Sequence, residues 1–328
     1  MIRLDKKIVL VGCGNIGSRH LQAIAKISSG IQTYIVEPNV NAQTLAKSRL
    51  NEITYDTTKH EFFWYKSISE LKDTGDLVIV TTHAAGRVDL ILDLIDKGNT
   101  RFLIEKLVCQ SVNEYKILLK KMEKHGAKGW VNTNYKYFEG YKKIKKLLEG
   151  QEIIHLSVFT HSKNGLATNS IHFIDLFAWL AEDRKIKLDG KFLSDKLVQN
   201  KRGESFAEFS GTITGATKNG SFVSMSFLPD LDESVIVSIS AGNGIHLIVD
   251  ETNGEVLSYG DIGDSNLEFK FEFVSSTTTS AVNDIFAQDD CLLPSLTELF
   301  DIHSEILRVF TEHLNKYTDD NIKLCPIT

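Results

Sequence analysis

Two ionisable side chains stand out in an apolar stretch of the second half of the chain. Between Asn169 and Ala181 the only ionisable residues are His172 and Asp175, and at this spacing they share one face of a predicted helix. Buried His and Asp side chains destabilise a fold unless they are hydrogen-bonded. The pair is therefore either a structural pair that fixes the helix, or a general base, His172, with Asp175 as its orienting carboxylate.

Lys106 is the second candidate for chemistry. It follows the apolar run Phe102–Ile104 and Glu105, at the carboxyl end of a predicted buried strand. An ammonium group held there can stabilise the alkoxide that forms when a hydroxyl group loses its proton. Glu-Lys pairs are also common on protein surfaces, so a solvated Lys106 remains the alternative.

A glycine pattern near the beginning of the chain indicates the cofactor for such chemistry. Gly12, Gly14 and Gly17 follow the apolar strand pattern Lys7–Val11 and precede the helical pattern Ser18–Ile27. In this arrangement the first glycine permits a tight turn, the second lets the backbone approach a pyrophosphate, and the third lets helix and strand pack closely. A helix N-terminus binds phosphate through its free N–H groups. The pattern therefore predicts a dinucleotide site.

The choice between the two nicotinamide dinucleotides depends on Glu37, which ends the next apolar run. A carboxylate at that place accepts hydrogen bonds from the adenosine ribose 2′-hydroxyl and repels a 2′-phosphate, so NAD is favoured over NADP. A solvated acid at a strand end is the alternative. The predicted cofactor contacts are Gly12, Gly14, Asn15, Ile16, Gly17, Glu37, Thr81, Thr82, Glu105 and Lys106.

The first part of the chain alternates predicted strands and helices, which is typical of a parallel sheet with helices on both faces. The strands are expected at Lys7–Val11, Gln32–Glu37, Leu77–Thr81, Phe102–Glu105 and Gly129–Asn132. The helices are expected at Ser18–Ile27, Asn41–Lys47, Ile68–Lys72, Ala84–Lys97 and Val112–His125. Residues 1–127 are therefore predicted to form a doubly wound Rossmann domain of an α/β protein, with ligands at the carboxyl ends of its strands.

Residues 128–328 are predicted to form an α+β domain whose sheet is large, open and mostly antiparallel. Its strands are expected at the alternating runs Phe206–Thr214, Ser221–Phe227, Ser234–Ser240, Ile245–Val249 and Glu268–Val274. One apolar helix covers Asn169–Ala181, and a final helix runs from Leu296 to about Tyr317. Because an exposed apolar sheet face favours burial by another subunit, a homodimer or homotetramer is expected.

The composition argues against several kinds of function. The chain has 328 residues and a formal net charge of −6, whereas nucleic-acid binding needs a concentrated basic face. No apolar run approaches the ~20 residues that span a bilayer, and the first strand begins too early to leave room for a signal peptide. The four cysteines have no metal-ligand spacing, which is typical of free thiols in the cytoplasm; they are Cys13, Cys109, Cys291 and Cys325.

The order of these motifs resembles the glucose–fructose oxidoreductase, inositol dehydrogenase and rhizopine-catabolism family, Gfo/Idh/MocA, over most of the chain. The glycine turn with His20 is similar to the family's cofactor turn, and Glu37 to its ribose acid. Glu105-Lys106 is similar to its Glu-Lys-Pro motif, and the run from His172 to Asp175 to its His-x-x-Asp helix. The resemblance implies that Lys106 contacts substrate and nicotinamide and that His172 is catalytic.

Two positions depart from the family pattern. Leu107 stands where the family has proline, and Thr168 stands where it often carries an aspartate one helical turn before the histidine. Thr168 and Asn169 also suit a helix N-cap, which explains both without a role in binding. The substrate contacts that the resemblance implies are Lys136, where the family commonly has arginine, Thr168, Asn169 and His172, with the loop residues His161, Lys163 and Asn164 as further candidates.

The motifs together predict an NAD(P)-dependent oxidoreductase. It would transfer a hydride between nicotinamide and a secondary hydroxyl or ketone of a sugar, cyclitol or nucleotide sugar. Thr168 and Leu107 motivate one alternative, a non-catalytic NAD-binding sensor or scaffold. The other alternative resembles the biliverdin reductases and reduces a C=C or C=N bond, a reaction that does not need His172 as a base.

Overall fold

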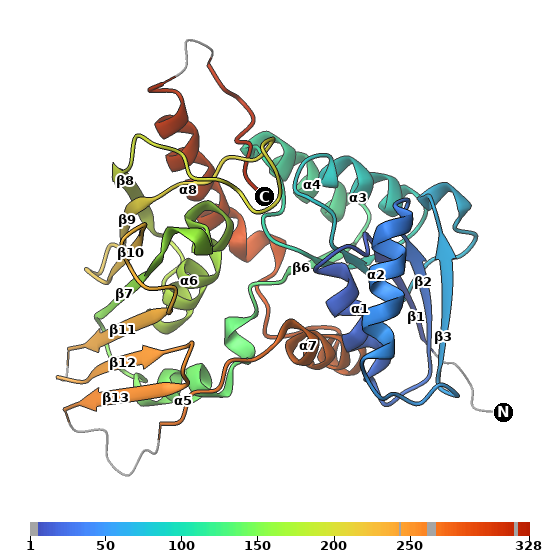
Figure 1. Ribbon diagram of the computed structural model, residues 1–328, viewed down its shortest axis with the longest axis horizontal. Coiled ribbons are helices and arrows are strands. Elements are labelled where there is room, and N and C mark those ends of the chain that lie inside the picture. Colours follow the sequence, from blue (N-terminus) through green and yellow to red (C-terminus); the bar gives the residue numbers. More distant parts are fainter. Residues whose placement is uncertain (1–5, 243, 261–266, 318–320) are drawn as a thin grey trace. The chain divides into compact units, whose positions relative to one another are not determined.

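The computed structural model describes residues 6–242, 244–260, 267–317 and 321–328 (Figure 1). The chain divides into two compact units. The first consists of the chain up to Cys109 together with Asn113–Asn134 and Glu272–Thr297. The second consists of Gln110–Val112, Tyr135–Phe271 and Glu298–Thr328, so that the chain returns to the first unit before it ends in the second.

The first unit is built on a six-stranded parallel sheet in the order β3-β2-β1-β4-β5-β6. The strands are β1 (Lys6–Val11), β2 (Ile31–Val36), β3 (His60–Tyr65), β4 (Leu77–Val80), β5 (Arg101–Ile104) and β6 (Lys128–Val131). The helices are α1 (Gly17–Ala25), α2 (Val40–Asn51), α3 (Arg87–Asp96), α4 (Val112–Lys124) and α7 (Val274–Gln288), with a 3-10 turn η1 (Ile68–Glu70). The sheet order reverses between β1 and β4, where doubly wound folds bind their ligands.

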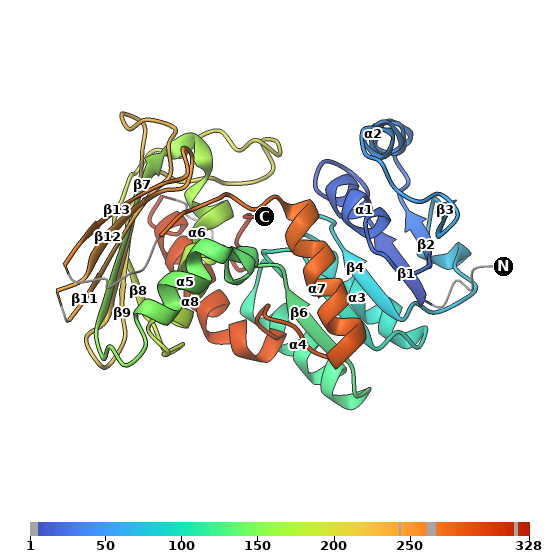
Figure 2. The same ribbon diagram turned by 90° about the horizontal axis from the view of Figure 1, so that it is seen from below.

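Helices cover both faces of this sheet. Right-handed crossovers in opposite directions from the centre place α1 on one face and α3 and α4 on the other, as Figure 2 shows. Helix α7 packs against α1, where the Thr279 hydroxyl donates a hydrogen bond of 2.9 Å to the carbonyl of Ala23. The central strands β1 and β4 are buried on both sides, which explains their continuous apolar sequences.

The second unit is built on a seven-stranded sheet in the order β13-β12-β11-β7-β10-β9-β8, in which only β7 and β10 pair in parallel among the described strands. The strands are β7 (Ile154–His161), β8 (Lys187–Leu193), β9 (Gly211–Ala216), β10 (Phe222–Leu228), β11 (Ile236–Ala241), β12 (His246–Asp250) and β13 (Glu255–Tyr259). The helices are α5 (Glu139–Leu147), α6 (Leu166–Leu180) and α8 (Leu296–Leu314), with 3-10 turns η2 (Asn134–Tyr137) and η3 (Ser162–Asn164).

One face of the second sheet is buried and the other is open. Along β7 the buried residues alternate with half-buried or exposed ones, and β10, β11 and β12 show the same period of two. Helix α6 packs on β7 and β10, and Figures 1 and 2 show α5, α6 and α8 on the same side of the sheet. The opposite face carries exposed Phe159 and Phe222. The predicted fold class, including the open sheet, is confirmed.

Sequence patterns misassigned or missed several elements, among them three edge strands and the central strand β7 of the second sheet. The strand predicted at Glu268–Val274 is wrong, because the described residues there have no regular structure and Val274 begins α7. The predicted helix Ile68–Lys72 is the 3-10 turn η1. Strands β3, β7, β8 and β13 and helix α7 were not predicted. Helix α7 has the Ser- and Thr-rich sequence of a loop, and it is stabilised by its packing on α1 rather than by propensity.

An aromatic cluster in the second unit encloses the carboxyl group of Glu251. Tyr135 and Tyr141 stack at 5.6 Å between ring centroids, and Phe269 meets Tyr141 edge-on at 5.1 Å. The Tyr135 hydroxyl donates a hydrogen bond of 3.2 Å to Glu251, and the Tyr141 hydroxyl donates a second one. Burial raises the pKa of Glu251 to about 7, although both tyrosine hydrogen bonds oppose the rise. The folded state therefore favours the neutral acid.

We expect this carboxyl group to make stability depend on pH. Between an ordinary value of 4.5 and the folded value of about 7, the folded state binds more protons than the unfolded state, so the free energy of unfolding falls as pH rises. The variant Glu251→Gln lacks this effect. Its stability relative to the wild type should increase by about 2–3 kcal/mol between pH 5 and pH 8, measured by urea unfolding. A difference that is independent of pH would contradict this assignment.

Candidate functional site

The glycine turn joins β1 to α1 by a close approach of backbone atoms. Gly12 has φ +83°, and its N–H donates a hydrogen bond of 2.9 Å to the carbonyl of Val36. A Cβ atom on Gly17 would lie 2.1 Å from the Gly12 oxygen and 2.6 Å from Oγ1 of Thr81. Only glycine fits at position 17, as the sequence pattern predicts.

Gly14 has a different environment, because a Cβ atom there would meet no described protein atom within 4 Å. The space beside Gly14 is therefore open. Among the described residues, no side chain caps the N-terminus of α1 and no acid lies in its first turn. An open backbone beside an uncapped helix N-terminus fits the pyrophosphate of a dinucleotide, which binds through N–H groups and the helix dipole.

Glu37 lies directly after β2 and is buried against the glycine turn. Its Oε2 accepts a hydrogen bond of 2.6 Å from the N–H of Cys13, and its Oε1 accepts one of 2.9 Å from the N–H of Asn39. A carboxylate has about four acceptor sites, so these two bonds leave capacity for a ribose hydroxyl. Burial and the charge of Glu37 raise the pKa of the Cys13 thiol to about 12, which is consistent with a small buried residue rather than a nucleophile.

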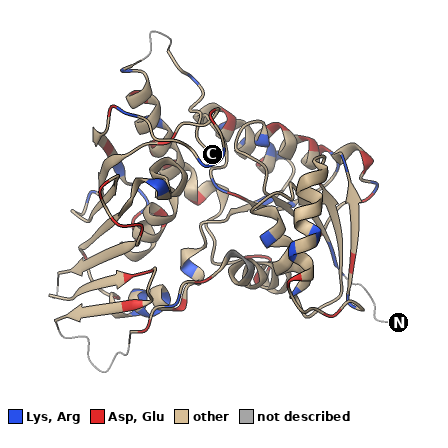
Figure 3. Cartoon of the chain, in the orientation of Figure 1, with Lys and Arg blue, Asp and Glu red and all other residues tan. Residues whose placement is uncertain are grey.

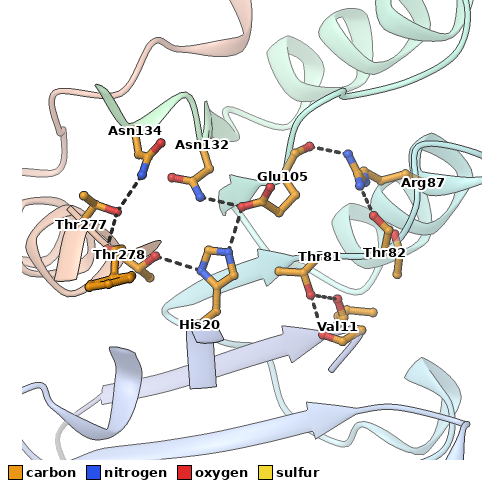
Figure 4. Close-up of polar contacts among 12 residues, drawn as sticks. Val11, His20, Thr81, Thr82, Arg87, Glu105, Asn132, Asn134, Thr277 and Thr278 are labelled. Atoms are coloured by element: carbon orange, nitrogen blue, oxygen red, sulfur yellow. Dashed lines mark hydrogen bonds and ion pairs between the residues drawn. The ribbon is translucent and has the colours of Figure 1, made fainter. Parts of the chain in front are cut away.

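Two further side chains hold the turn in place. The Thr81 hydroxyl donates to the carbonyls of Gly12 and of Val11, the latter at 3.2 Å (Figure 4). The guanidinium of Arg49 in α2 donates hydrogen bonds of 2.6 Å to the carbonyl of Asn15 and 2.7 Å to Oγ of Ser18. The predicted cofactor contacts Asn15 and Thr81 are thus fixed by bonds within the first unit.

The Glu105 carboxylate is the centre of a buried hydrogen-bond network (Figure 4). Its Oε1 accepts a hydrogen bond of 2.5 Å from Nδ2 of Asn132 and lies 2.9 Å from Nε2 of His20. The other ring nitrogen of His20, Nδ1, lies 3.0 Å from Oγ1 of Thr278. Burial alone would raise the pKa of Glu105, but these hydrogen bonds and the charges of His20 and Lys106 hold it at about 2. An ionised Glu105 therefore ties β5 to α1 and to the end of β6.

The backbone around Lys106 is held by one buried guanidinium. Arg87, at the first position of α3, donates hydrogen bonds to the carbonyls of Thr82, Glu105 and Leu107 (Figure 4 shows the first two). Lys106 is itself buried, with 7% of its surface exposed, and the Lys106–Leu107 peptide bond is cis. Five donors and a planar shape allow one arginine to serve several carbonyls at once.

In the second unit, α6 presents a single partly exposed face. Its half-buried residues are Thr168, Asn169, His172 and Trp179, and every other residue of this helix is buried. The three predicted substrate contacts on α6 therefore share one face. The alternative that Thr168 and Asn169 cap the helix is wrong, because the N-cap is Gly165 with φ +76° and both residues lie inside the helix.

Asp175 lies on the buried side of α6, where it pairs with two cations. Its Oδ1 accepts a hydrogen bond of 2.9 Å from the guanidinium of Arg184, and its Oδ2 lies 3.4 Å from Nζ of Lys136. Burial lowers the pKa of Lys136, and the charge of Asp175 opposes this. His172 stacks on the ring of Tyr135 at 5.4 Å and 24°, and Tyr135 is the residue that donates to Glu251.

The loop before α6 is fixed by its own contacts. His161 is the last residue of β7, and its Nδ1 accepts a hydrogen bond of 2.9 Å from the N–H of Lys163. Nζ of Lys163 lies 3.0 Å from Oε1 of Glu233, and Nδ2 of Asn164 donates 3.0 Å to the carbonyl of Glu233. These three residues are the further substrate contacts expected from the sequence. Two of them, Lys163 and Asn164, are bound to Glu233 of the second unit.

The structure groups the predicted site residues by unit. The first unit contains the glycine turn, Glu37, Thr81, Thr82, Glu105 and Lys106, and the second contains Lys136, Thr168, Asn169, His172 and Asp175. Sequence reasoning missed several residues that surround them: Arg49, Arg87, Asn132, Tyr135 and Glu208. No sequence signal marks these residues, since each is brought to its place by a segment distant in the chain.

No group of His, Cys, Asp and Glu residues in the described part of the chain has the arrangement of a metal site. None of the described helices combines the length and the apolar character that crossing a membrane requires. Figure 3 shows Lys and Arg interspersed with Asp and Glu along the helices.

Comparisons with known proteins agree with this geometry. Residues 6–133 match the model of a family described as "Oxidoreductase family, NAD-binding Rossmann fold", the Gfo/Idh/MocA family. For residues 6–133 this confirms the resemblance and the NAD-binding Rossmann domain that the motifs predict. No curated protein sequence matches the chain.

Several solved structures share the fold over nearly the whole chain. An oxidoreductase from Agrobacterium radiobacter in complex with NAD+, L-tartaric acid and magnesium is 15% identical, with a TM-score of 0.69, covering 97% of this chain and 98% of its own. A dehydrogenase from Bordetella pertussis in complex with NADH and UDP-GlcNAcA is 14% identical, with a TM-score of 0.69 and coverage of 94% and 96%. The myo-inositol dehydrogenase from Lactobacillus casei, in complex with NAD(H) and myo-inositol, is 15% identical, with a TM-score of 0.68 and coverage of 95% and 95%.

Two glycine substitutions should separate folding from cofactor binding. Gly14→Ala adds a Cβ in open space, so the melting temperature should not change, whereas the affinity for NAD should fall about tenfold because the methyl group occupies the phosphate approach. Gly17→Ala forces a clash with Gly12 and Thr81, so it should lose about 1–3 kcal/mol of stability as well. Calorimetric titration with NAD and thermal unfolding measure both. Unchanged NAD affinity of Gly14→Ala would contradict the placement of the phosphates.

Proposed function

Because residues 6–133 are an NAD-binding Rossmann domain of the Gfo/Idh/MocA oxidoreductase family, we propose that the chain is a dehydrogenase acting on a secondary hydroxyl. Its substrate is a sugar, a cyclitol or a nucleotide sugar, or the corresponding ketone in the reverse direction. The observation that carries the proposal is this family match together with the open backbone at Gly14. Relatives that share the fold were crystallised with NAD+ or NAD(H) and with L-tartaric acid or myo-inositol, which supports a polyhydroxylated substrate.

NAD is the proposed cofactor in preference to NADP. The buried Glu37 carboxylate, held by the N–H groups of Cys13 and Asn39, favours a ribose with a free 2′-hydroxyl and repels a 2′-phosphate. The glycine turn and the N-terminus of α1 bind the pyrophosphate. NAD supplies the hydride acceptor when it is bound, and the chain supplies proton transfer and charge stabilisation.

The proposed chemical roles belong to Lys106 and His172. The imidazole of His172 takes the proton of the substrate hydroxyl, because histidine can change its charge near neutral pH. The ammonium group of Lys106 stabilises the alkoxide that results. Asp175 is proposed from the sequence as the carboxylate that orients His172. Its ion pairs are with Lys136 and Arg184, so we propose that it acts on His172 through the position of α6. Lys136, Thr168 and Asn169 are the proposed substrate contacts.

A second copy of the chain is the proposed partner of the open sheet face. This face exposes Phe159, Phe222 and Leu257, whose apolar rings and methyl groups favour burial. A homodimer or homotetramer is the expected assembly. The proposed location is the cytoplasm, since all four cysteines are free thiols.

Replacing Lys106 should slow turnover strongly while the cofactor still binds. Lys106→Ala removes the charge that stabilises the alkoxide, so kcat should fall about 10²- to 10³-fold, measured as NADH formation with a panel of polyols, sugars and nucleotide sugars. The Kd for NAD should stay within about threefold of the wild type. Lys116→Ala, an exposed lysine of the same unit, is the control. Full activity of Lys106→Ala would remove Lys106 from the mechanism.

His172→Ala distinguishes the three candidate functions. A hydroxyl dehydrogenase should lose about 10²- to 10⁴-fold in kcat, because no other base is proposed. A reductase of a C=C or C=N bond should keep most of its activity in this variant. A sensor should bind NAD but show no turnover of any panel compound even as the wild-type chain.

A further inference from the structure

The N-terminus of α6 is capped by a carboxylate from a distant part of the chain. Glu208 precedes β9, and its Oε1 accepts hydrogen bonds of 2.5 Å from the N–H of Ala167 and 3.1 Å from that of Phe209. Its Oε2 accepts a hydrogen bond of 2.6 Å from the hydroxyl of Thr168 and one of 3.3 Å from the N–H of the same residue. All four hydrogen bonds come from N–H or O–H groups of three residues, an arrangement that suits an ionised carboxylate.

Gly165 is the reason that this carboxylate fits. A Cβ atom on Gly165 would lie 2.7 Å from Oε2 of Glu208, so any other residue at the N-cap would displace the carboxylate. The N-terminus of a helix carries a partial positive charge, which favours an anion there. Glu208 is nevertheless 97% buried, with 3% of its surface exposed. Burial raises the pKa of Glu208, and the hydrogen bonds from Thr168, Phe209 and Ala167 oppose the rise.

The residue that binds this carboxylate, Thr168, lies one helical turn before His172. The two residues are four positions apart on the partly exposed face of α6, a spacing that brings their Cβ atoms to about 5–6 Å. The resemblance described above implies a carboxylate at position 168, where this chain has a hydroxyl. The Thr168 hydroxyl instead holds the carboxylate of Glu208.

We propose that Glu208 is the positioning residue for His172, supplying through Thr168 the negative charge that position 168 lacks. The anion favours the imidazolium that forms when His172 takes a proton, and it fixes the first turn of the helix that carries His172. This inference rests on the proposed function only for its catalytic consequence, because the effect on His172 exists without substrate.

Other ionisable groups also surround His172. Asp175 follows on α6 and pairs with Lys136 and Arg184, and Tyr135 stacks on the imidazole and donates to Glu251. Glu208 differs from them because its four hydrogen-bond donors are uncharged. A Glu→Gln substitution at position 208 therefore removes one charge and keeps the shape of the side chain and one acceptor oxygen.

The first test needs no substrate. NMR of histidine-labelled protein should follow the titration of His172, whose signal is the one missing in His172→Gln. In Glu208→Gln this titration should move to lower pH by an easily measured margin, because a nearby anion is lost. Glu305→Gln, a charge removed between α8 and β8 in the same unit, is the matched control and should leave it unchanged. An unmoved His172 titration in Glu208→Gln overturns the proposal.

The second test is kinetic and includes a rescue. Glu208→Gln should lower kcat about 10- to 100-fold and move the acid limb of the pH profile to lower pH, with KM for NAD unchanged. Thr168→Asp in the Glu208→Gln background restores the charge one turn before His172 and should recover most of the loss. No recovery in the folded double variant would contradict the proposal. If Glu208→Gln does not fold, Thr168→Val replaces it in both tests and should shift both readouts in the same direction.

The two tests fail in different ways. A wild-type chain that turns over no compound of the panel would contradict the proposed dehydrogenase function. The NMR titration would still decide the role of Glu208. If the wild-type chain turns over substrate and the His172 titration is unshifted in Glu208→Gln, the role of Glu208 is overturned and the dehydrogenase function is not.

Discussion

The first unit depends on a buried negative charge that must be satisfied. An ionised carboxylate away from water destabilises a fold unless several donors surround it, and Glu105 obtains them from His20 of α1 and Asn132 after β6. His20 in turn lies within hydrogen-bonding distance of Thr278 of α7. One charge thereby sets the positions of three elements around the end of β5, and the residue that follows it is Lys106. The glycine turn, Arg87 and Thr81 fix the remaining backbone at this end of the sheet.

The second unit solves a similar problem at α6. This helix is almost wholly buried, and burying a charge or a free N–H group destabilises a fold unless the group has a partner. Asp175 has Lys136 and Arg184, His172 has the ring of Tyr135, and the free N–H groups of the first turn have Glu208. The half-buried face with Thr168, Asn169 and His172 is the face that we propose to contact the substrate. One orientation of α6 therefore places Asp175 beside its cationic partners and leaves His172 on the partly exposed face.

The sequence predicts those features whose cause is local. The glycine turn, Glu37 and the central strands follow from short motifs and continuous apolar runs, because both their chemistry and their burial are encoded within a few residues. The edge strands β3, β8 and β13 are partly exposed and lack that signal. Helix α7 and the carboxylate of Glu208 could not be predicted, since α7 is stabilised by packing on α1 and Glu208 lies 40 residues from Thr168. From the sequence, Thr168 stands where the family often has an aspartate. In the structure, its hydroxyl donates a hydrogen bond to the carboxylate of Glu208.

We propose that this chain moves a hydride between the carbinol carbon of a polyhydroxylated substrate and NAD. The most direct measurement uses polyols and sugars deuterated at the carbinol carbons, incubated with NAD and the wild-type chain, with the nicotinamide product analysed by NMR. We expect deuterium at C4 of the nicotinamide ring and a slower rate than with the unlabelled substrate. Reduced cofactor that contains no deuterium, or no reduced cofactor with any of these compounds, would contradict it.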